Sequence, residues 1–441
     1  MFSYCNMLEK LNLSNFNTTK VEDMSYMFNM CQKLTELNLS NFKTEKVKKM
    51  SYMFSYCNML EKLNLSNFNT AEVTNMSSMF YGCYKLPSLN LSNFNTAKVT
   101  NMSQMFYTCK ELPSLDLTNF NTAKATNMQE MFKGCSTLQT IYVSDNFVVT
   151  GITDENYKKD LFTGCEALPE YGDAKTSSDY ANYKTGYFTK LVVRNGDERY
   201  GIKGETTQLT VDNLVLADNK DFVAYDPFKA TAASYNRTIN TTWATLCLPF
   251  EVSLDGKNFR AFELGSVSNN EVVLKELNTI IPAGTPVIIK MNDGETQLNF
   301  TEADKEIANE VKTAATADGN YQLQGLYTQK LFDKNADNNC YIVKGNKLMN
   351  PAKLMQNTNK ETVGSKPFRA YMIDKSSAPA AGAKMFSIGF DNDGTTAIDN
   401  LNTIANDNAI YYDLQGHRLN APQKGINIVK RGNKTMKVII K

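Results

Sequence analysis

The sequence has very little of what most catalytic and metal sites require. Its 441 residues include one histidine, His417, and one tryptophan, Trp243. A histidine-dependent catalytic triad and a zinc site with several histidines are therefore nearly excluded. We predict that the chain is not an enzyme and that it binds no cofactor and no metal. An enzyme would have to work with carboxylates, lysines or tyrosines.

A surplus of charge and a long apolar run are missing as well. The chain has 47 Lys and Arg against 46 Asp and Glu, which gives a net charge of +1. The lack of a basic field argues against a nucleic-acid partner or an anionic membrane. No run approaches the roughly 20 apolar residues of a transmembrane helix. The first residues also lack the charged and apolar regions of a signal peptide.

What the sequence has in abundance is one repeated unit. Cysteines recur every 26 residues from Cys5 to Cys135, and residues 1–18 are identical to residues 53–70. This period and the pattern LxxLxLxxF match leucine-rich repeats. A single unit buries too little apolar surface to offset the entropy of ordering its backbone, so the units should stack. We predict an α/β leucine-rich repeat solenoid over residues 1–190, with residues 131–190 as an atypical unit and a cap.

Each unit is expected to hold one strand and one short helix. The L-x-L segment at 63–65 alternates apolar and polar residues, which is typical of a strand. Further along the unit, Met76, Met79 and Phe80 are spaced i, i+3 and i+4. This spacing predicts one apolar face of a helix, which Gly82 can end.

The repeated cysteines, methionines and phenylalanines are expected to fill the interior. The cysteines of adjacent units, which we call the ladder cysteines, would lie close enough to form disulfides. A chain with a large apolar core does not need disulfides for its stability. The 26-residue spacing is also unlike any zinc-ligand pattern. We therefore predict buried thiols that act as small apolar side chains.

The outward-facing strand positions are the candidate ligand-binding residues. They should form one concave, small and polar face of the solenoid, a kind of surface that often binds proteins. The alternative is a solvated face whose asparagines only join neighbouring units. The predicted face consists of Lys10, Asn12, Glu36, Asn38, Lys62, Asn64, Ser88, Asn90, Ser114, Asp116 and Tyr142.

The period ends near residue 190, and short strand-like runs separated by turn signals follow. We predict an all-β sandwich-like domain over 191–395 and a small β tail over 396–441. Trp243 is expected to anchor the core of the middle domain rather than to stack on a sugar. The segment 333–339, DKNADNN, resembles half of a calcium loop, but it lacks the required Gly and Glu and is predicted to be a turn.

The repeat MFSYCNMLEKLNLSNFNTAEVTNMSSMF resembles that of the BspA-like leucine-rich repeat surface proteins of bacteria, over residues 1 to about 170. The resemblance implies a cell-surface protein that engages host or neighbouring-cell macromolecules, and it supplies no catalytic residue. WATLCLPF at 243–250 resembles a module of extracytoplasmic Bacteroidetes proteins. The tail, with YDLQG at 412–416, resembles Bacteroidetes sorting or anchoring tails.

Together these features predict a non-enzymatic, adhesin-like binding protein, secreted or displayed on a bacterial cell surface. The expected partners are extracellular or host proteins, with glycans possible but unsupported. Because Met1 opens a complete unit, we expect further repeats and an export signal upstream. The first alternative is a surface spacer without a specific ligand. The second is a glycan hydrolase with paired carboxylates in 191–395.

Overall fold

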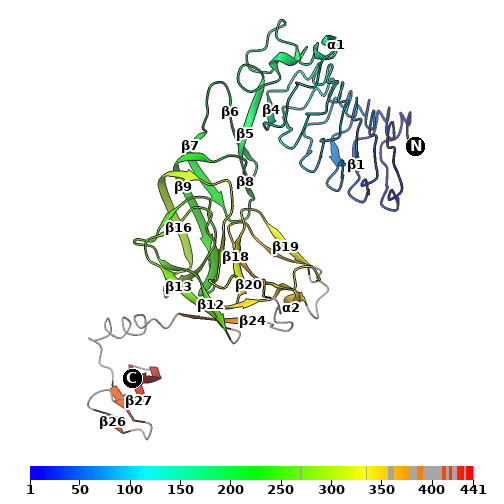
Figure 1. Ribbon diagram of the computed structural model, residues 1–441. Coiled ribbons are helices and arrows are strands. Elements are labelled where there is room, and N and C mark those ends of the chain that lie inside the picture. The colour runs from blue at the N-terminus through cyan, green and yellow to red at the C-terminus, as the bar shows by residue number, and fades with distance from the viewer. Residues whose placement is uncertain are drawn as a thin grey trace.

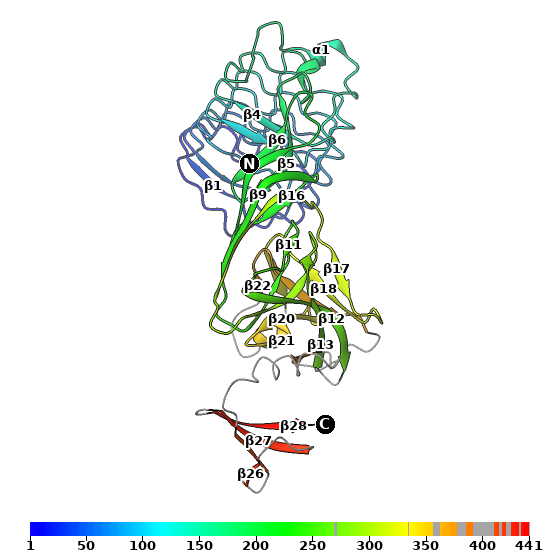
Figure 2. The same ribbon diagram turned by 90° about the vertical axis from the view of Figure 1, so that its left-hand side faces the viewer.

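A computed structural model describes residues 1–268, 271–333, 335–355, 362–376, 385–390, 410–413, 417–419, 425–431 and 434–440 (Figure 1). The chain first forms a stack of repeats and then a larger β-rich region. It ends in a separate small sheet (Figures 1 and 2).

The repeat units stack side by side in register. Leu37 of one unit pairs with Leu63 of the next in a parallel bridge, and Leu115 pairs with Ile141 in the same way. A second series of parallel bridges links Asp23, Lys49, Asn75, Asn101 and Asn127. The strands of the stack are β1 (Glu36–Asn38), β2 (Lys62–Asn64), β3 (Ser114–Asp116) and β4 (Thr140–Val143).

The helix predicted in each unit is absent, although the side chains that predicted it are buried. The amide of Met76 donates to the carbonyl of Asn101 in the next unit at 3.0 Å, and that of Phe80 donates to Met105 at 2.9 Å. Between them, the amide of Met79 donates to Met76 three residues back, at 3.3 Å. Consecutive turns with bonds to the next unit therefore replace the helical i to i−4 pattern.

The prediction of an α/β leucine-rich repeat solenoid is therefore wrong. The molecule is nearly all β. Among the described residues, the α-helices are two short segments, α1 (Glu155–Lys158) and α2 (Pro351–Met355), and one 3₁₀ turn lies at Ser178–Tyr180. None of the three lies in the repeated turn segments. No helix of the described chain is long and apolar enough to cross a membrane.

The interior of the stack is a set of aligned side-chain ladders. Phe80 stacks between Phe54 and Phe106, with ring centroids 5.6 and 5.8 Å away. The Sγ of Cys83 donates to the carbonyl oxygen of Phe54 at 3.3 Å. All nine cysteines, each within the described residues, are free thiols, and every one except the half-buried Cys5 is buried. The ladder cysteines were predicted to act only as small buried apolar side chains. They also link neighbouring units through their thiol hydrogen bonds.

One strand joins the stack to the second half. β5 (Phe188–Asn195) pairs with β4 in parallel, and with β6 (Glu198–Ile202) and β8 (Phe222–Ala224) antiparallel. Phe188 lies in the core of the stack, whereas Val192 and Val193 lie in the next core. The predicted boundary between residues 190 and 191 therefore falls inside a continuous strand.

The second half is built on a large sheet that curls into a half-barrel. Its strand order is β10-β15-β12-β13-β24-β21-β20-β23-β18-β17. The strands are β10 (Trp243–Leu246), β12 (Phe259–Ser268), β13 (Glu271–Leu277), β15 (Val287–Met291), β17 (Thr313–Ala315), β18 (Tyr321–Gly325), β20 (Cys340–Lys344), β21 (Lys347–Met349), β23 (Ala370–Asp374) and β24 (Met385–Phe390). The predicted sandwich of two facing sheets is therefore corrected to one curled sheet with smaller companions.

The companion sheets and the C-terminal sheet complete the fold. A three-stranded sheet has the order β16-β9-β7, and two pairs join β11 to β14 and β19 to β22. Their bounds are β7 (Thr210–Ala217), β9 (Phe228–Thr238), β11 (Val252–Ser253), β14 (Ile280–Ile281), β16 (Gln297–Ile307), β19 (Lys330–Asp333) and β22 (Thr362–Ser365). The C-terminal sheet, in the order β26-β25-β27-β28, holds β25 (Ile410–Tyr412), β26 (Arg418–Leu419), β27 (Gly425–Arg431) and β28 (Lys434–Ile440).

Trp243 is a core residue, as predicted. Its side chain is 8% exposed, and its ring centroid lies 5.6 Å from that of Phe262. The strand that carries it, β10, is buried at all four positions. The ring is therefore not available as an open stacking platform for a sugar.

Candidate binding surface on the repeat stack

The structure brings the predicted ligand-binding residues together on one face, which we call the strand face. Where β1 and β2 pair in register, Glu36 lies beside Lys62 and Asn38 beside Asn64. Nine of the predicted residues are exposed, namely Lys10, Asn12, Glu36, Asn38, Lys62, Asn64, Ser88, Asn90 and Ser114. Asp116 and Tyr142, at the end nearest β5, are half-buried.

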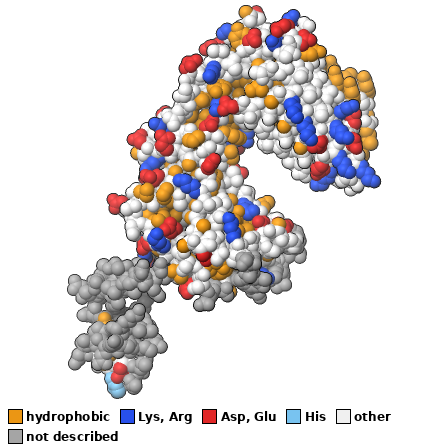
Figure 3. All heavy atoms as spheres, in the orientation of Figure 1, with side chains coloured by type: hydrophobic (Ala, Val, Ile, Leu, Met, Phe, Trp, Pro, Cys, Tyr) orange, Lys and Arg blue, Asp and Glu red, His pale blue; other side chains and the backbone are white. Residues whose placement is uncertain are grey.

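Apart from the half-buried Asp116, the charge on the strand face is carried by a few exposed side chains. The Glu36 carboxylate and the Lys62 ammonium are 3.9 Å apart, and their side chains are 64% and 74% exposed. Such a pair contributes about 0–1 kcal/mol to stability, so both groups are free to exchange it for contacts with a partner. Figure 3 shows charged side chains of both signs gathered toward the N-terminal end of the stack.

The asparagines of the strand face close turns rather than join units. The Oδ1 of Asn12 accepts the amide of Ser14 at 3.0 Å, and that of Asn64 accepts the amide of Ser66 at 3.0 Å. A different asparagine makes the link between units, since the Nδ2 of Asn93 donates to the carbonyl oxygen of Leu65 at 2.9 Å. Asx turns of this kind are local, and the asparagines that make them, Asn12 and Asn64, are exposed.

A shallow hollow lies on the strand face at its N-terminal end. Its volume is about 260 Å³. It is lined by Leu11, Asn12, Leu13, Ser14, Asn38, Ser40 and Asn41. Two of the predicted residues, Asn12 and Asn38, therefore border a real depression with amide and hydroxyl groups around a small apolar floor.

The opposite end of the strand face is occupied by arginines of the second half. The carboxylate of Asp116 lies 2.8 Å from Arg194 and 3.1 Å from Arg199. The Nη2 of Arg194 also donates to the Oγ1 of Thr118 at 2.8 Å. Burial alone would raise the pKa of Asp116, but the Thr118 hydrogen bond and the charge of Arg194 lower it on balance. Asp116 therefore holds an internal ion pair and is not open to a ligand.

Tyr142 and Lys190 belong to the same junction. Burial raises the pKa of the Tyr142 phenol, so the hydroxyl stays neutral and can donate. Lys190 pairs with Asp145 at 2.6 Å and with Asp226 at 3.0 Å, which ties the last unit to the second half.

Sequence reasoning missed the arginines of this junction. Arg194 and Arg199 are directly paired across the hairpin formed by β5 and β6, so both side chains lie on one face. The segment NGD at 195–197 is a turn signal that could have indicated the hairpin. Asp116, which pairs with both arginines, lies 78 positions before Arg194 in the sequence. No local pattern could therefore indicate these ion pairs.

The described residues offer no group of three or more His, Cys, Asp or Glu side chains that could hold a metal ion. In the calcium-like segment, Asp333 accepts the amides of Asn335 and Ala336 at 2.7 and 2.9 Å. Asp337 pairs with Lys330 at 3.2 Å. These contacts form a turn, in agreement with the sequence-based interpretation.

One family model matches the chain, and it covers the repeats. The family, DUF285, is described as a Mycoplasma protein of unknown function, and it matches residues 1–88 and 58–168. No curated protein and no solved structure matches the chain. The repeat stack is thus similar to a family for which no activity is described.

Proposed function

We propose that the protein is a non-enzymatic, adhesin-like binding protein whose strand face contacts host or neighbouring-cell macromolecules. The observation that carries the proposal is the set of nine exposed polar side chains at equivalent positions of successive units, of which Glu36 and Lys62, and Asn38 and Asn64, are paired in register. Small amide, hydroxyl and charged groups repeated at strand spacing suit a broad contact with an extended protein surface. Few aromatic or arginine anchors lie on the face, so each contact should be weak and affinity should come from their number.

We further propose that the protein acts outside the cell, either secreted or displayed on a bacterial surface. The support is the resemblance of the repeat to BspA-like surface proteins and of the tail to Bacteroidetes anchoring segments. Extracellular or host proteins are the proposed partners.

The proposal is tested by binding of the full chain to immobilised extracellular-matrix proteins. A double charge swap, Glu36→Lys with Lys62→Glu, keeps the net charge and the ion pair but reverses their order on the strand face. The matched control is the same swap at Glu72 and Lys98, another exposed pair between adjacent units, whose charged groups lie 2.6 Å apart. We expect saturable binding that the first swap weakens at least threefold and the control leaves unchanged. Binding that tolerates both swaps equally, or none at all, would contradict the proposal.

The alternative is a spacer that only extends the chain. It is favoured by the identity of residues 1–18 and 53–70, which leaves little chemical variety for recognition. Deletion of residues 53–78 removes one 26-residue period and should preserve the stack. If the protein is a binding protein, the deletion lowers its affinity for the extracellular-matrix protein. If it is a spacer, no binding is detected either before or after the deletion.

A further inference from the structure

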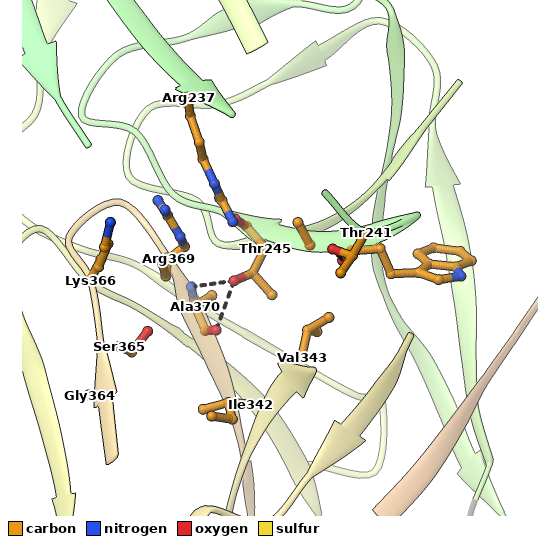
Figure 4. A pocket seen from close by; sticks show the side chains of 12 residues that line it. Arg237, Thr241, Thr245, Ile342, Val343, Gly364, Ser365, Lys366, Arg369 and Ala370 are labelled. Atoms are coloured by element: carbon orange, nitrogen blue, oxygen red, sulfur yellow. Dashed lines mark hydrogen bonds between the residues drawn. The ribbon is translucent and has the colours of Figure 1, made fainter. Parts of the chain in front are cut away.

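A second polar site lies in the half-barrel region, away from the strand face. It is a cavity of about 220 Å³ between β9, β10, β20 and the turn from β22 to β23 (Figure 4). Three cationic side chains line it, namely Arg237, Lys366 and Arg369. Figure 4 shows their charged ends on the same side of the cavity, above the strand that carries Ala370.

Two of the three cations are deeply held. The side chains of Arg237 and Arg369 are 10% and 12% exposed, whereas that of Lys366 is 58% exposed. Burial lowers the pKa of Arg237 to about 10, and the charge of Arg369 contributes. The guanidinium therefore keeps its proton at neutral pH. A buried charge of this kind is costly unless an opposite charge compensates it.

A single carboxylate faces all three cations. The Oδ1 of Asp218, just after β7, lies 2.6 Å from Arg369 and 4.0 Å from Arg237, and the Oδ2 lies 3.6 Å from Lys366. The hydroxyl of Tyr235 also donates to Asp218, at 2.7 Å. Among the described residues, these three positive charges and the one negative charge leave an excess of two positive charges at the cavity.

One donor in this cluster, the Nε of Arg237, faces the Asp218 carboxylate at 4.0 Å but is too far away to hydrogen-bond to it. The Nε of Arg237 is buried and makes no hydrogen bond to the described residues. Its Nη1 donates to the carbonyl oxygen of Thr245 at 2.7 Å, which fixes the direction of the guanidinium plane. A buried donor of a charged group that makes no hydrogen bond is energetically costly. An unsatisfied buried donor in a folded protein calls for an explanation, and an anion bound beside it is one.

We propose that this cavity is an anion site that takes a tetrahedral dianion, a phosphate or a sulfate group. Such a group neutralises the two excess charges, and its several oxygens can accept from the guanidinium of Arg237 and the ammonium of Lys366 at once. The hydroxyl of Ser365, which also lines the cavity, supplies a neutral donor, whereas that of Thr241 already donates to the carbonyl oxygen of Trp243 at 2.8 Å. The proposal does not depend on the function assigned to the strand face.

The site is tested with inorganic phosphate, sulfate and acetate on the full chain, at a constant ionic strength set with chloride. Isothermal calorimetry gives the dissociation constant, and a rise in melting temperature reports binding to the folded state. We expect phosphate and sulfate to bind saturably and acetate to bind at least about tenfold more weakly, because it carries one charge. Phosphate and chloride that stabilise the chain equally would overturn the proposal, as would acetate that binds as tightly as phosphate.

Two variants and one control locate the binding. Lys366→Ala removes an exposed side chain and should raise the dissociation constant for phosphate about five- to tenfold. Lys124→Ala removes an equally charged, exposed lysine from the repeat stack and should change nothing. Arg237→Met should abolish binding, and circular dichroism shows whether it folds. If Lys366→Ala and Lys124→Ala weaken phosphate binding equally, the binding depends on the general surface charge and not on this cavity. That result would overturn the proposal.

Phosphate and sulfate esters of a monosaccharide identify the source of the anion. Esters that bind more tightly than the inorganic ions would show that the cavity takes a group of a larger molecule. Binding of the inorganic ions alone would assign it to a free ion. Either result supports the site, provided that Lys366→Ala weakens it.

Discussion

At the scale of the residue, the stack depends on side chains that bond to the neighbouring unit. The ladder thiols donate to phenylalanine carbonyl groups, as Cys109 does to Phe80 at 3.2 Å. The hydroxyl of Thr70 donates to the carbonyl oxygen of Asn95 at 2.8 Å and accepts the amide of the same residue at 2.7 Å. A buried backbone group without a partner is costly, so these side chains stabilise the stack and also fix its register.

The buried thiols make stability sensitive to alkaline pH. Burial raises the pKa of Cys83 from 9.0 to about 12, and it raises the pKa of Cys57 and Cys109 well above 9. Below pH 9 the thiol is protonated in both states, and its contribution is fully present. Between pH 9 and about 12 only the unfolded chain releases the proton, so the free energy of unfolding falls as pH rises. Urea unfolding between pH 7 and pH 11 should show this fall.

Cys83→Ser is the matched control, because a serine hydroxyl does not titrate in this range. The variant should lose stability less steeply between pH 9 and pH 11 than the parent chain. Identical slopes for the two proteins would contradict the assignment of the effect to the ladder thiols.

At the scale of the element, the repeated turn segment explains where sequence-based prediction succeeds and fails. The spacing of Met76, Met79 and Phe80 predicts their burial, which is confirmed at 0% exposure for all three. The spacing does not predict the conformation of their backbone, because successive turns of three residues give the same apolar spacing as a helix. The turns require residues with positive φ, and these are Tyr26, Tyr52, Ser78, Gln104 and Glu130, at φ 54–59°. Non-glycine residues rarely adopt this conformation, so the sequence carries no local signal for it.

The strand positions were easier to predict. Alternation in L-x-L places the polar residue outward, and the nine exposed residues of the strand face follow this rule. Asp116 is half-buried and does not follow this rule, because its partners Arg194 and Arg199 come from a hairpin far along the chain. The cation cluster at Arg237 and Arg369 joins separate strands in the same way, and sequence spacing alone could not indicate it.

The phenylalanine ladder beside the strands should carry much of the stability of a unit. Phe68 is 2% exposed, and its ring stacks on Phe94 with centroids 6.5 Å apart. Phe68→Ala should lower the free energy of unfolding by about 3–5 kcal/mol, because it leaves a cavity in the interior. Phe16 occupies the same position of the first unit but is 37% exposed, so Phe16→Ala should cost clearly less. Equal costs in urea unfolding would show that Phe68 is not held in a closed core.

At the scale of the whole molecule, one sheet runs from the repeats into the second half. β3, β4, β5 and β6 are neighbours in this sheet, so the last units share backbone hydrogen bonds with the first strands of the second half. The ion pairs of Asp116 with Arg194 and of Lys190 with Asp226 reinforce the same junction. The strand face is therefore presented from a joined body rather than from a flexible linker.

The central claim is that the units stack through backbone bonds from each turn segment to the next. Amide hydrogen exchange of the full chain tests it most directly. The amides of Met76, Ser78, Phe80 and Gly82 donate to carbonyl groups one unit away, at 2.8–3.0 Å. We predict strong protection at all four positions, together with a circular dichroism spectrum that lacks the helical minimum at 222 nm. Exchange there at the rate of an unfolded chain, or a clear helical spectrum, would contradict the account.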